Sequence, residues 1–330
     1  MNNSEIRTYA DRYREGIVAR LWDQWTAIGG GGYASNAKAV TWAVDPEALI
    51  LASSACFAHE PRLRETCLAW ILTNGGLVSI ARLKRMQQEY GFGDKAAMTD
   101  LAETLLATNP SMRSWKSVTG WDSGSVVKEV RPFLRKDLAL VTHAGSEAWL
   151  FLKLRSLFGV SSRVEILFWM FYNGRSQSNW MSRETGWYGK TVQKTLREMV
   201  ISGHVREDRH GSSRRYFLAR SEWSSFFPDR ELSAIWLGQH HLYAGIFGIL
   251  ETMQRCAGEG LAPEVATFLI VEELGKGYLA HQRARGYPVR ESYTVESLPA
   301  VLEALVANIE GSPQWPVGAF VVNPHHCRIE

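Results

Sequence analysis

Apolar positions recur along most of the chain at spacings of three and four residues, which predicts a mainly α-helical protein. In the first 110 residues such stripes predict helices over 4–27, 61–74 and 79–90. A further helix is predicted to begin at Asp45-Pro46-Glu47, which combines a capping side chain, a proline at the first helical position and an early acidic residue. Glycines 29 to 32 predict a flexible break and not a phosphate loop, because neither the preceding strand nor the Lys-Ser/Thr of such a loop is present.

Changes in this pattern also predict the domain organisation. The order of the helices over 61–74 and 79–90 resembles a degenerate helix-turn-helix, although any helical bundle would produce the same order. The periodicity fades over 111–143, and helical spacing returns over 235–253, 265–279 and 298–309. We therefore expect a helical N-terminal domain (1–110), a connector (111–153), a central domain (154–220) and a C-terminal helical domain (228–330).

The central segment has a pattern of its own. Its first part, Leu154 to Tyr172, is apolar nearly all round, which predicts a buried first helix. A short helix is predicted from Ser178 to Gly186, where the glycine suits a left-handed turn. A third helix is predicted from Gly189 to Ser202, with Val192, Leu196, Met199 and Val200 as its core stripe. Two extended segments around Gly211-Ser-Ser follow, which predicts a β-hairpin.

Positive charge is concentrated in this segment. Residues 151–220 hold thirteen lysines and arginines against five acidic residues, so this window has a net charge of about +8 and the rest of the chain about −5. A local basic module in a mildly acidic chain is typical of polyanion binding, which neutralises phosphates and releases their counterions. The candidate DNA-binding residues lie on the exposed face of the third helix and on the hairpin: Lys190, Thr191, Gln193, Lys194, Arg197, Arg206, Arg209, His210, Arg214 and Arg215.

Helix, short helix, glycine turn, basic helix and basic hairpin, in this order, resemble the winged helix-turn-helix superfamily of bacterial MarR-like and ArsR-like regulators. The stretch Thr191 to Val205 is similar to their recognition-helix pattern of valine, leucine and a glycine before the wing. The resemblance covers about a fifth of the chain and implies that the third helix lies in a major groove of duplex DNA.

Other chemistry is poorly supported by the sequence. The four cysteines have no short paired spacing, and the neighbouring His240 and His241 point about 100° apart on a helix. We therefore expect no metal site, no cofactor and no catalytic residue. Trp180 and Trp187 are interpreted as packing residues at a helix junction and not as platforms for base stacking.

The sequence also gives expectations about location and partners. The first residues lack the basic-then-apolar order of a secretory signal, and no run of about eighteen apolar residues is present, so we expect no membrane association and a cytoplasmic protein with reduced thiols. The function expected is that of a sequence-specific double-stranded DNA-binding transcriptional regulator, a repressor acting as a homodimer. Two alternatives stay open: a winged-helix module for protein–protein interaction, and the docking arm of an enzyme that acts on nucleic acid.

Overall fold

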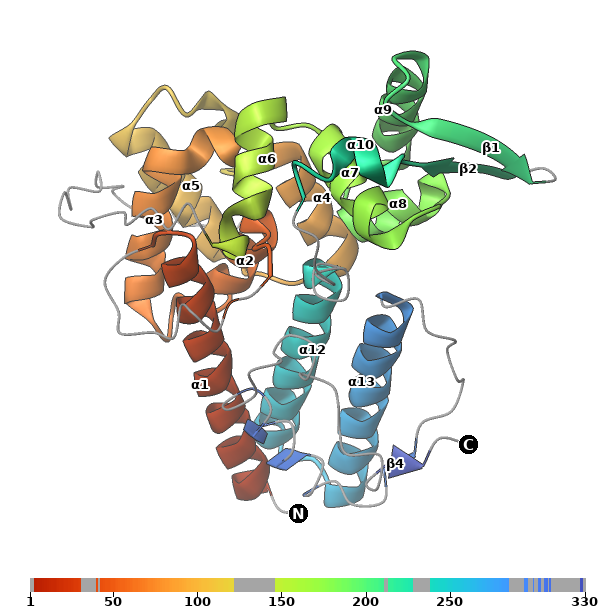
Figure 1. The fold of residues 1–330 in the computed structure, drawn as a ribbon. Coiled ribbons are helices and arrows are strands. Elements are labelled where there is room, and N and C mark those ends of the chain that lie inside the picture. Colours follow the sequence, from red (N-terminus) through yellow and green to blue (C-terminus); the bar gives the residue numbers. More distant parts are fainter. Residues whose placement is uncertain are drawn as a thin grey trace. The chain divides into compact units, whose positions relative to one another are not determined.

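The computed structural model describes residues 3–30, 40, 42–121, 146–210, 213–227, 238–284 and short stretches between 294 and 328. It is mainly α-helical, as the apolar spacing predicts (Figure 1). The chain groups into two compact units, Met1–Asp23 with Gln239–Glu330 and Gln24–Gly238, and α1 (Asn3–Ala27) contributes to both. The three domains expected from the sequence, with boundaries near residues 110, 153 and 228, stay a prediction about independent folding.

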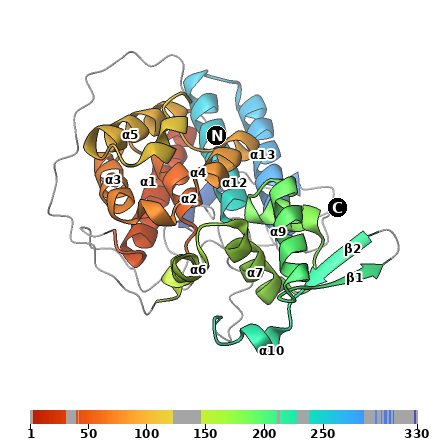
Figure 2. The ribbon, with the colours of Figure 1, turned by 90° about the horizontal axis from the view of Figure 1, so that it is seen from above.

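The first unit is built on the N-terminal part of α1 and on two long helices, α12 (Gln239–Gly258) and α13 (Pro263–Ala284). α12 and α13 lie side by side (Figures 1 and 2). The described residues between 299 and 309 are helical, and the two-residue strands β3 (Thr294–Val295) and β4 (Cys327–Arg328) pair antiparallel. The helical spacing predicted for this part of the chain is therefore confirmed wherever the structure describes it.

The second unit begins with a group of helices whose starts follow from their capping residues. These are α2 (Pro46–Ser54), α3 (Pro61–Asn74), η2 (Gly75–Leu77), α4 (Ile80–Tyr90), α5 (Lys95–Thr108) and η3 (Arg113–Ser117). The side chains of Asp45, Ser79 and Asp94 accept hydrogen bonds from the backbone N–H groups at the starts of α2, α4 and α5. The predicted helix start at Asp45-Pro46-Glu47 is confirmed.

α3 and α4 are joined through a short turn that contains two glycines. The axis of Pro61–Leu77 and that of Ile80–Tyr90 differ by 116°. This angle lies within the range of about 90–120° found between the two helices of helix-turn-helix motifs. The resemblance that the sequence suggests for this pair therefore extends to its angle.

The second half of this unit contains η4 (Glu147–Trp149), α6 (Leu150–Phe158), α7 (Ser162–Asn173), α8 (Ser178–Thr185), α9 (Gly189–Ile201), β1 (Arg206–His210), β2 (Ser213–Phe217) and α10 (Arg220–Trp223). The expected helix over 154–172 is wrong as one element, since it divides into α6 and α7. The break falls at Gly159, which has a positive φ of 78° that a continuous helix does not allow. The predicted bounds of α8, α9 and the hairpin are confirmed within a residue or two.

A single hydrophobic core joins these elements. Val164 and Phe168 of α7, Leu196 of α9 and Tyr216 of β2 are all buried in it. The ring of Phe171 stacks on that of Phe227 beyond α10, with centroids 4.4 Å apart. Because one face of α9 is committed to this core, its other face is left for solvent or for a partner.

Candidate nucleic-acid interface

α9 has one buried and one exposed face, as its spacing predicts. Val192, Leu196 and Met199 are buried, and Thr195 shares a 2.7 Å hydrogen bond with the hydroxyl of Ser162 on α7. Val200 is partly buried at the edge of the core. The opposite face exposes four of the predicted contact residues, Lys190, Gln193, Lys194 and Arg197, while Thr191 is half-buried. The helix therefore presents basic and amide side chains on a surface anchored by the core.

The antiparallel hairpin β1–β2 extends away from the helices of its unit (Figures 1 and 2). Arg209 lies opposite Arg214 in its register. Its four predicted arginines, Arg206, Arg209, Arg214 and Arg215, are exposed. The side chain of His210 and the tip residues 211 and 212 lie outside the described part of the chain.

The base of the hairpin is fixed by a contact that sequence analysis missed. Ser176, between α7 and α8, forms an antiparallel bridge with Tyr216 of β2. The amide of Ser176 donates to the carbonyl of Tyr216 over 3.0 Å, and the amide of Tyr216 donates back over 2.8 Å. Ser176 thus adds a single β-bridge to the two-stranded hairpin. No periodicity is available over a single residue, so no sequence pattern could predict it.

A groove of about 640 Å³ lies between α8, α9 and the hairpin. It brings together three of the predicted residues, Gln193, Arg197 and Arg214. Its other lining residues are Gln177, Ser178, Asn179, Val200, Ile201, Glu207, Ser213 and Tyr216. Lys190, Thr191, Lys194, Arg206, Arg209 and Arg215 do not line this groove. The polar start of α8, which sequence analysis did not single out, therefore belongs to the same surface.

The cations of this surface are only lightly neutralised. Lys194, Arg206 and Arg214 pair with exposed or half-exposed carboxylates at 4.0, 3.3 and 3.7 Å respectively. Such exposed pairs contribute roughly 0–1 kcal/mol each, so a polyanion can displace them easily. Within the described part of the chain, no carboxylate lies within 4.0 Å of Lys190, Arg197, Arg209 or Arg215.

Two aromatic residues near this surface differ in their placement. Trp187 is buried, which confirms the packing role predicted for it. The same prediction is wrong for Trp180, whose side chain is 42% exposed on α8. The guanidinium of Arg183 lies 4.2 Å from its ring centroid, so a cation–π contact on the surface replaces burial in the core.

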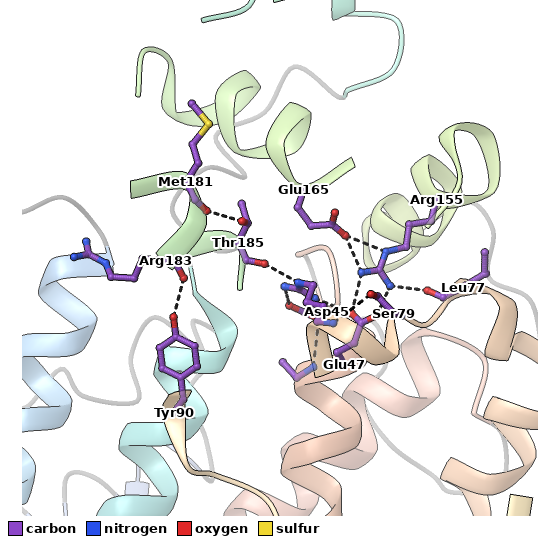
Figure 3. A network of polar contacts seen from close by, with 12 residues as sticks. Asp45, Glu47, Leu77, Ser79, Tyr90, Arg155, Glu165, Met181, Arg183 and Thr185 are labelled. Carbon is purple, nitrogen blue, oxygen red and sulfur yellow. Dashed lines mark hydrogen bonds and ion pairs between the residues drawn. The ribbon is translucent and has the colours of Figure 1, made fainter. Parts of the chain in front are cut away.

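Side chains of α4 donate hydrogen bonds to the end of α8, next to the turn between α8 and α9. Arg82 Nε donates to the carbonyl of Thr185 over 2.6 Å, and the Tyr90 hydroxyl donates to the carbonyl of Arg183 over 2.9 Å (Figure 3). These carbonyls belong to the last turn of α8, which has no helical N–H partners for them. Gly186, at the turn, has a φ of 70° and lies so close to α4 that a Cβ there would be 2.8 Å from Met86 Cε.

Buried charges extend this support (Figure 3). Arg82 pairs with Asp45 and Glu47, and Arg155 pairs with Glu47 and Glu165. All five side chains of this network are almost fully buried. Two guanidinium groups therefore face three carboxyl groups. Glu47 is shared by both arginines, so the network links α2 and α4 to α6 and α7.

Burial raises the pKa of Glu165, and the neighbouring Glu47 adds to this, while the two arginines oppose it. One oxygen of Glu165 is buried and accepts no hydrogen bond, which fits a carboxyl group that takes up a proton readily. Burial would lower the pKa of Arg82, but its ion pairs with Asp45 and Glu47 outweigh burial and raise it. Arg82 therefore stays charged.

Metal and membrane sites have little support in the described part of the chain. No group of three or more His, Cys, Asp or Glu side chains there could hold a metal ion. Cys56, Cys67 and Cys256 are free thiols. His240 is buried and His241 half-buried in α12, and their ring centroids lie 4.4 Å apart, so the two rings do not point away from each other as expected. No single helix among the described residues has the length and apolar composition needed to cross a bilayer.

Comparisons with known proteins add no assignment: no family model, no curated protein and no solved structure matches this chain.

Proposed function

We propose that residues 154–220 form a winged helix-turn-helix domain and that the chain uses it to bind double-stranded DNA in a sequence-specific manner. The order α7, Ser176, α8, α9, β1 and β2 supports this, since it provides three helices and a two-stranded hairpin to which Ser176 adds an isolated β-bridge. The observation with most weight is that the exposed face of α9 and the hairpin beside it form one lightly neutralised basic surface.

In this proposal α9 lies in the major groove. Lys190, Gln193 and Lys194, on its exposed face, reach base edges, where lysine pairs with guanine and glutamine with adenine. Arg197 and the hairpin arginines contact phosphates, which positions the protein without reading sequence. The hairpin lies over the neighbouring minor groove, as wings and basic arms do.

We further propose that binding serves transcriptional repression by a homodimer, through steric occlusion of a promoter. A two-fold protein binds a palindromic site whose half-sites lie about one helical turn apart. This part of the proposal rests on the winged helix-turn-helix assignment and not on a contact in the structure.

The proposal is tested by titrating the full chain with the DNA upstream of its own gene and with a random-sequence duplex, from about 50 to about 200 mM salt. A regulator binds the upstream DNA more tightly and shows a slope of log affinity against log salt of roughly −0.9 per phosphate contact. Equal affinity for both duplexes would contradict sequence specificity. Absence of binding at low salt would contradict DNA binding altogether.

One observation favours a second candidate, a protein-docking surface. The groove between α9 and the hairpin includes two apolar residues, Val200 and Ile201, and Ile201 is 81% exposed. Exposed apolar side chains beside a polar rim occur at protein interfaces. If the groove docks a protein, replacing Lys194 and Arg197 by alanine leaves the binding of that protein intact. If the surface binds DNA, the same replacement weakens the binding of DNA.

A further inference from the structure

A second groove, of about 340 Å³, lies between α4, η3 and the start of α9. Its lining residues are Ile80, Ala81, Lys84, Ser114, Ser117 and Tyr188. Tyr188 is also the residue that caps α9 at its N-terminus, and Lys190 follows it by two positions. The groove therefore reaches the N-terminal end of α9, next to Lys190.

Positive charge lies in this second groove and beside it. Lys84 is half-buried in the groove wall, and Lys116 and Arg113 are exposed on η3 next to the lining residues Ser114 and Ser117. Within the residues that the structure describes, none of these three cations has a carboxylate within 4.0 Å. The groove begins at the first turn of α4, whose N-terminal end adds partial positive charge although the Ser79 side chain already accepts a hydrogen bond from the Arg82 N–H. Two serine side chains add hydroxyl groups.

α4 is fastened to the start of α9, so the two basic surfaces are fixed relative to each other. The guanidinium of Arg85 lies 4.9 Å from the ring centroid of Tyr188, and the Tyr188 hydroxyl donates to Gln88 Oε1 over 3.2 Å. The contacts of Arg82 and Tyr90 with the end of α8 add to this. The position of the second groove relative to a rigid ligand bound on α9 is therefore fixed.

We propose that this second groove binds the phosphate backbone of the same duplex that α9 contacts, so that α4 and η3 lengthen the DNA interface. The inference rests on the proposed function. Lone cations, hydroxyl groups and helix N–H groups are the donors that hold phosphates in protein–DNA complexes. The 116° angle between α3 and α4 adds support, because it gives α4 the place of the second helix of a helix-turn-helix.

The experiment measures the affinity of the full chain for a random-sequence duplex of about 30 base pairs by fluorescence anisotropy across a salt series. The variant Lys84→Ala/Lys116→Ala is compared with the unsubstituted chain and with Lys95→Ala/Lys153→Ala, which removes two exposed lysines from α5 and α6. Loss of two phosphate contacts is expected to reduce the salt slope by roughly 1.8 and to weaken binding at least about tenfold at roughly 50 mM salt. The control variant is expected to bind as the unsubstituted chain does.

The outcomes separate this inference from the proposed function. If Lys194→Ala/Arg197→Ala weakens binding but Lys84→Ala/Lys116→Ala binds like the control, the second groove does not contact DNA and the inference is overturned, while α9 keeps its role. If the unsubstituted chain does not bind the duplex, both fail. Thermal unfolding midpoints within about 2 °C of each other show that the variants are folded. The variant Lys84→Arg, which keeps the charge, is expected to retain most of the affinity.

Discussion

At the scale of single residues, the basic side chains divide into two kinds. Those of α9 and the hairpin are exposed, as the helical spacing of Lys190, Lys194 and Arg197 predicts. Arg82 and Arg155 are fully buried instead, and each contacts two carboxylates and a backbone carbonyl. Arginine is almost never fully buried unless it is paired. The ion pairs of these two arginines span between 10 and 108 positions of the chain, so they leave no local pattern. Sequence analysis could not predict this network.

Replacing Arg82 by methionine is expected to destabilise the protein by about 3–5 kcal/mol, because it leaves buried carboxylates without their partner. Urea unfolding measures this loss. The matched control is Arg64→Met, since Arg64 pairs with Asp100 at the surface and its loss is expected to cost less than about 1 kcal/mol. Similar losses for the two variants would show that the buried network contributes no more than a surface pair.

Glu165 gives the network a dependence on pH. Burial raises the pKa of Glu165 in the folded state above its value in the unfolded state, so the folded state binds the proton more tightly. The free energy of unfolding therefore falls as the pH rises from the unfolded-state pKa through the folded-state pKa. Glu165→Gln keeps an oxygen for Arg155 but does not ionise, so its stability relative to the unsubstituted chain is expected to increase from about pH 4 towards neutral pH. Urea unfolding at several pH values measures the difference, and a constant difference would contradict the assignment.

At the scale of elements, sequence patterns predict those features of a helix or turn that depend on residues close together in the sequence. The starts of α2 and α4, the buried stripe of α9 and the glycine that ends α8 all follow from local spacing and capping chemistry. The division of 154–172 into α6 and α7 was missed, because an apolar run masks the effect of Gly159. The packing of α4 beneath the α8–α9 turn was also missed, since it joins elements far apart in sequence.

Gly186 tests this packing. Gly186→Ala is expected to be more destabilising than Gly203→Ala, although both glycines have a positive φ, of 70° and 78°. A Cβ at Gly203 meets nothing within 4 Å, so that variant reports backbone strain alone, about 1 kcal/mol. At Gly186 the Cβ also meets Met86 on α4. Urea unfolding of both variants measures the difference, and equal losses would mean that the Met86 side chain moves away from the added Cβ at no measurable cost.

At the scale of the whole molecule, the helical class follows from the apolar spacing, whereas the function depends on how surfaces are assembled. The predicted contact residues come from α9 and two strands, and only Gln193, Arg197 and Arg214 among them line one groove, beside the Ser176–Tyr216 bridge at the base of the hairpin. The apolar stripe of α12, with Leu242, Ile246 and Ile249, is buried and therefore offers no exposed contact surface to the proposed dimer.

The dimer stays a separate prediction. Light scattering of the full chain at micromolar concentration is expected to give twice the mass of one chain, because a two-fold protein matches a palindromic site. Two exposed apolar side chains on α13, Val265 and Phe268, offer a contact surface, so Phe268→Asp is expected to lower the measured mass. The mass of a single chain for the unsubstituted protein would contradict dimerisation and leave DNA binding open.

The most direct test of the central claim is the affinity of the full chain for a random-sequence duplex when two cations of α9 are removed. Lys194→Ala/Arg197→Ala is expected to bind at least about tenfold more weakly at roughly 50 mM salt, with a salt slope lower by roughly 1.8, while the control Lys95→Ala/Lys153→Ala binds as the unsubstituted chain does. Equal affinity for all three proteins would contradict the claim that α9 and the hairpin form a DNA interface.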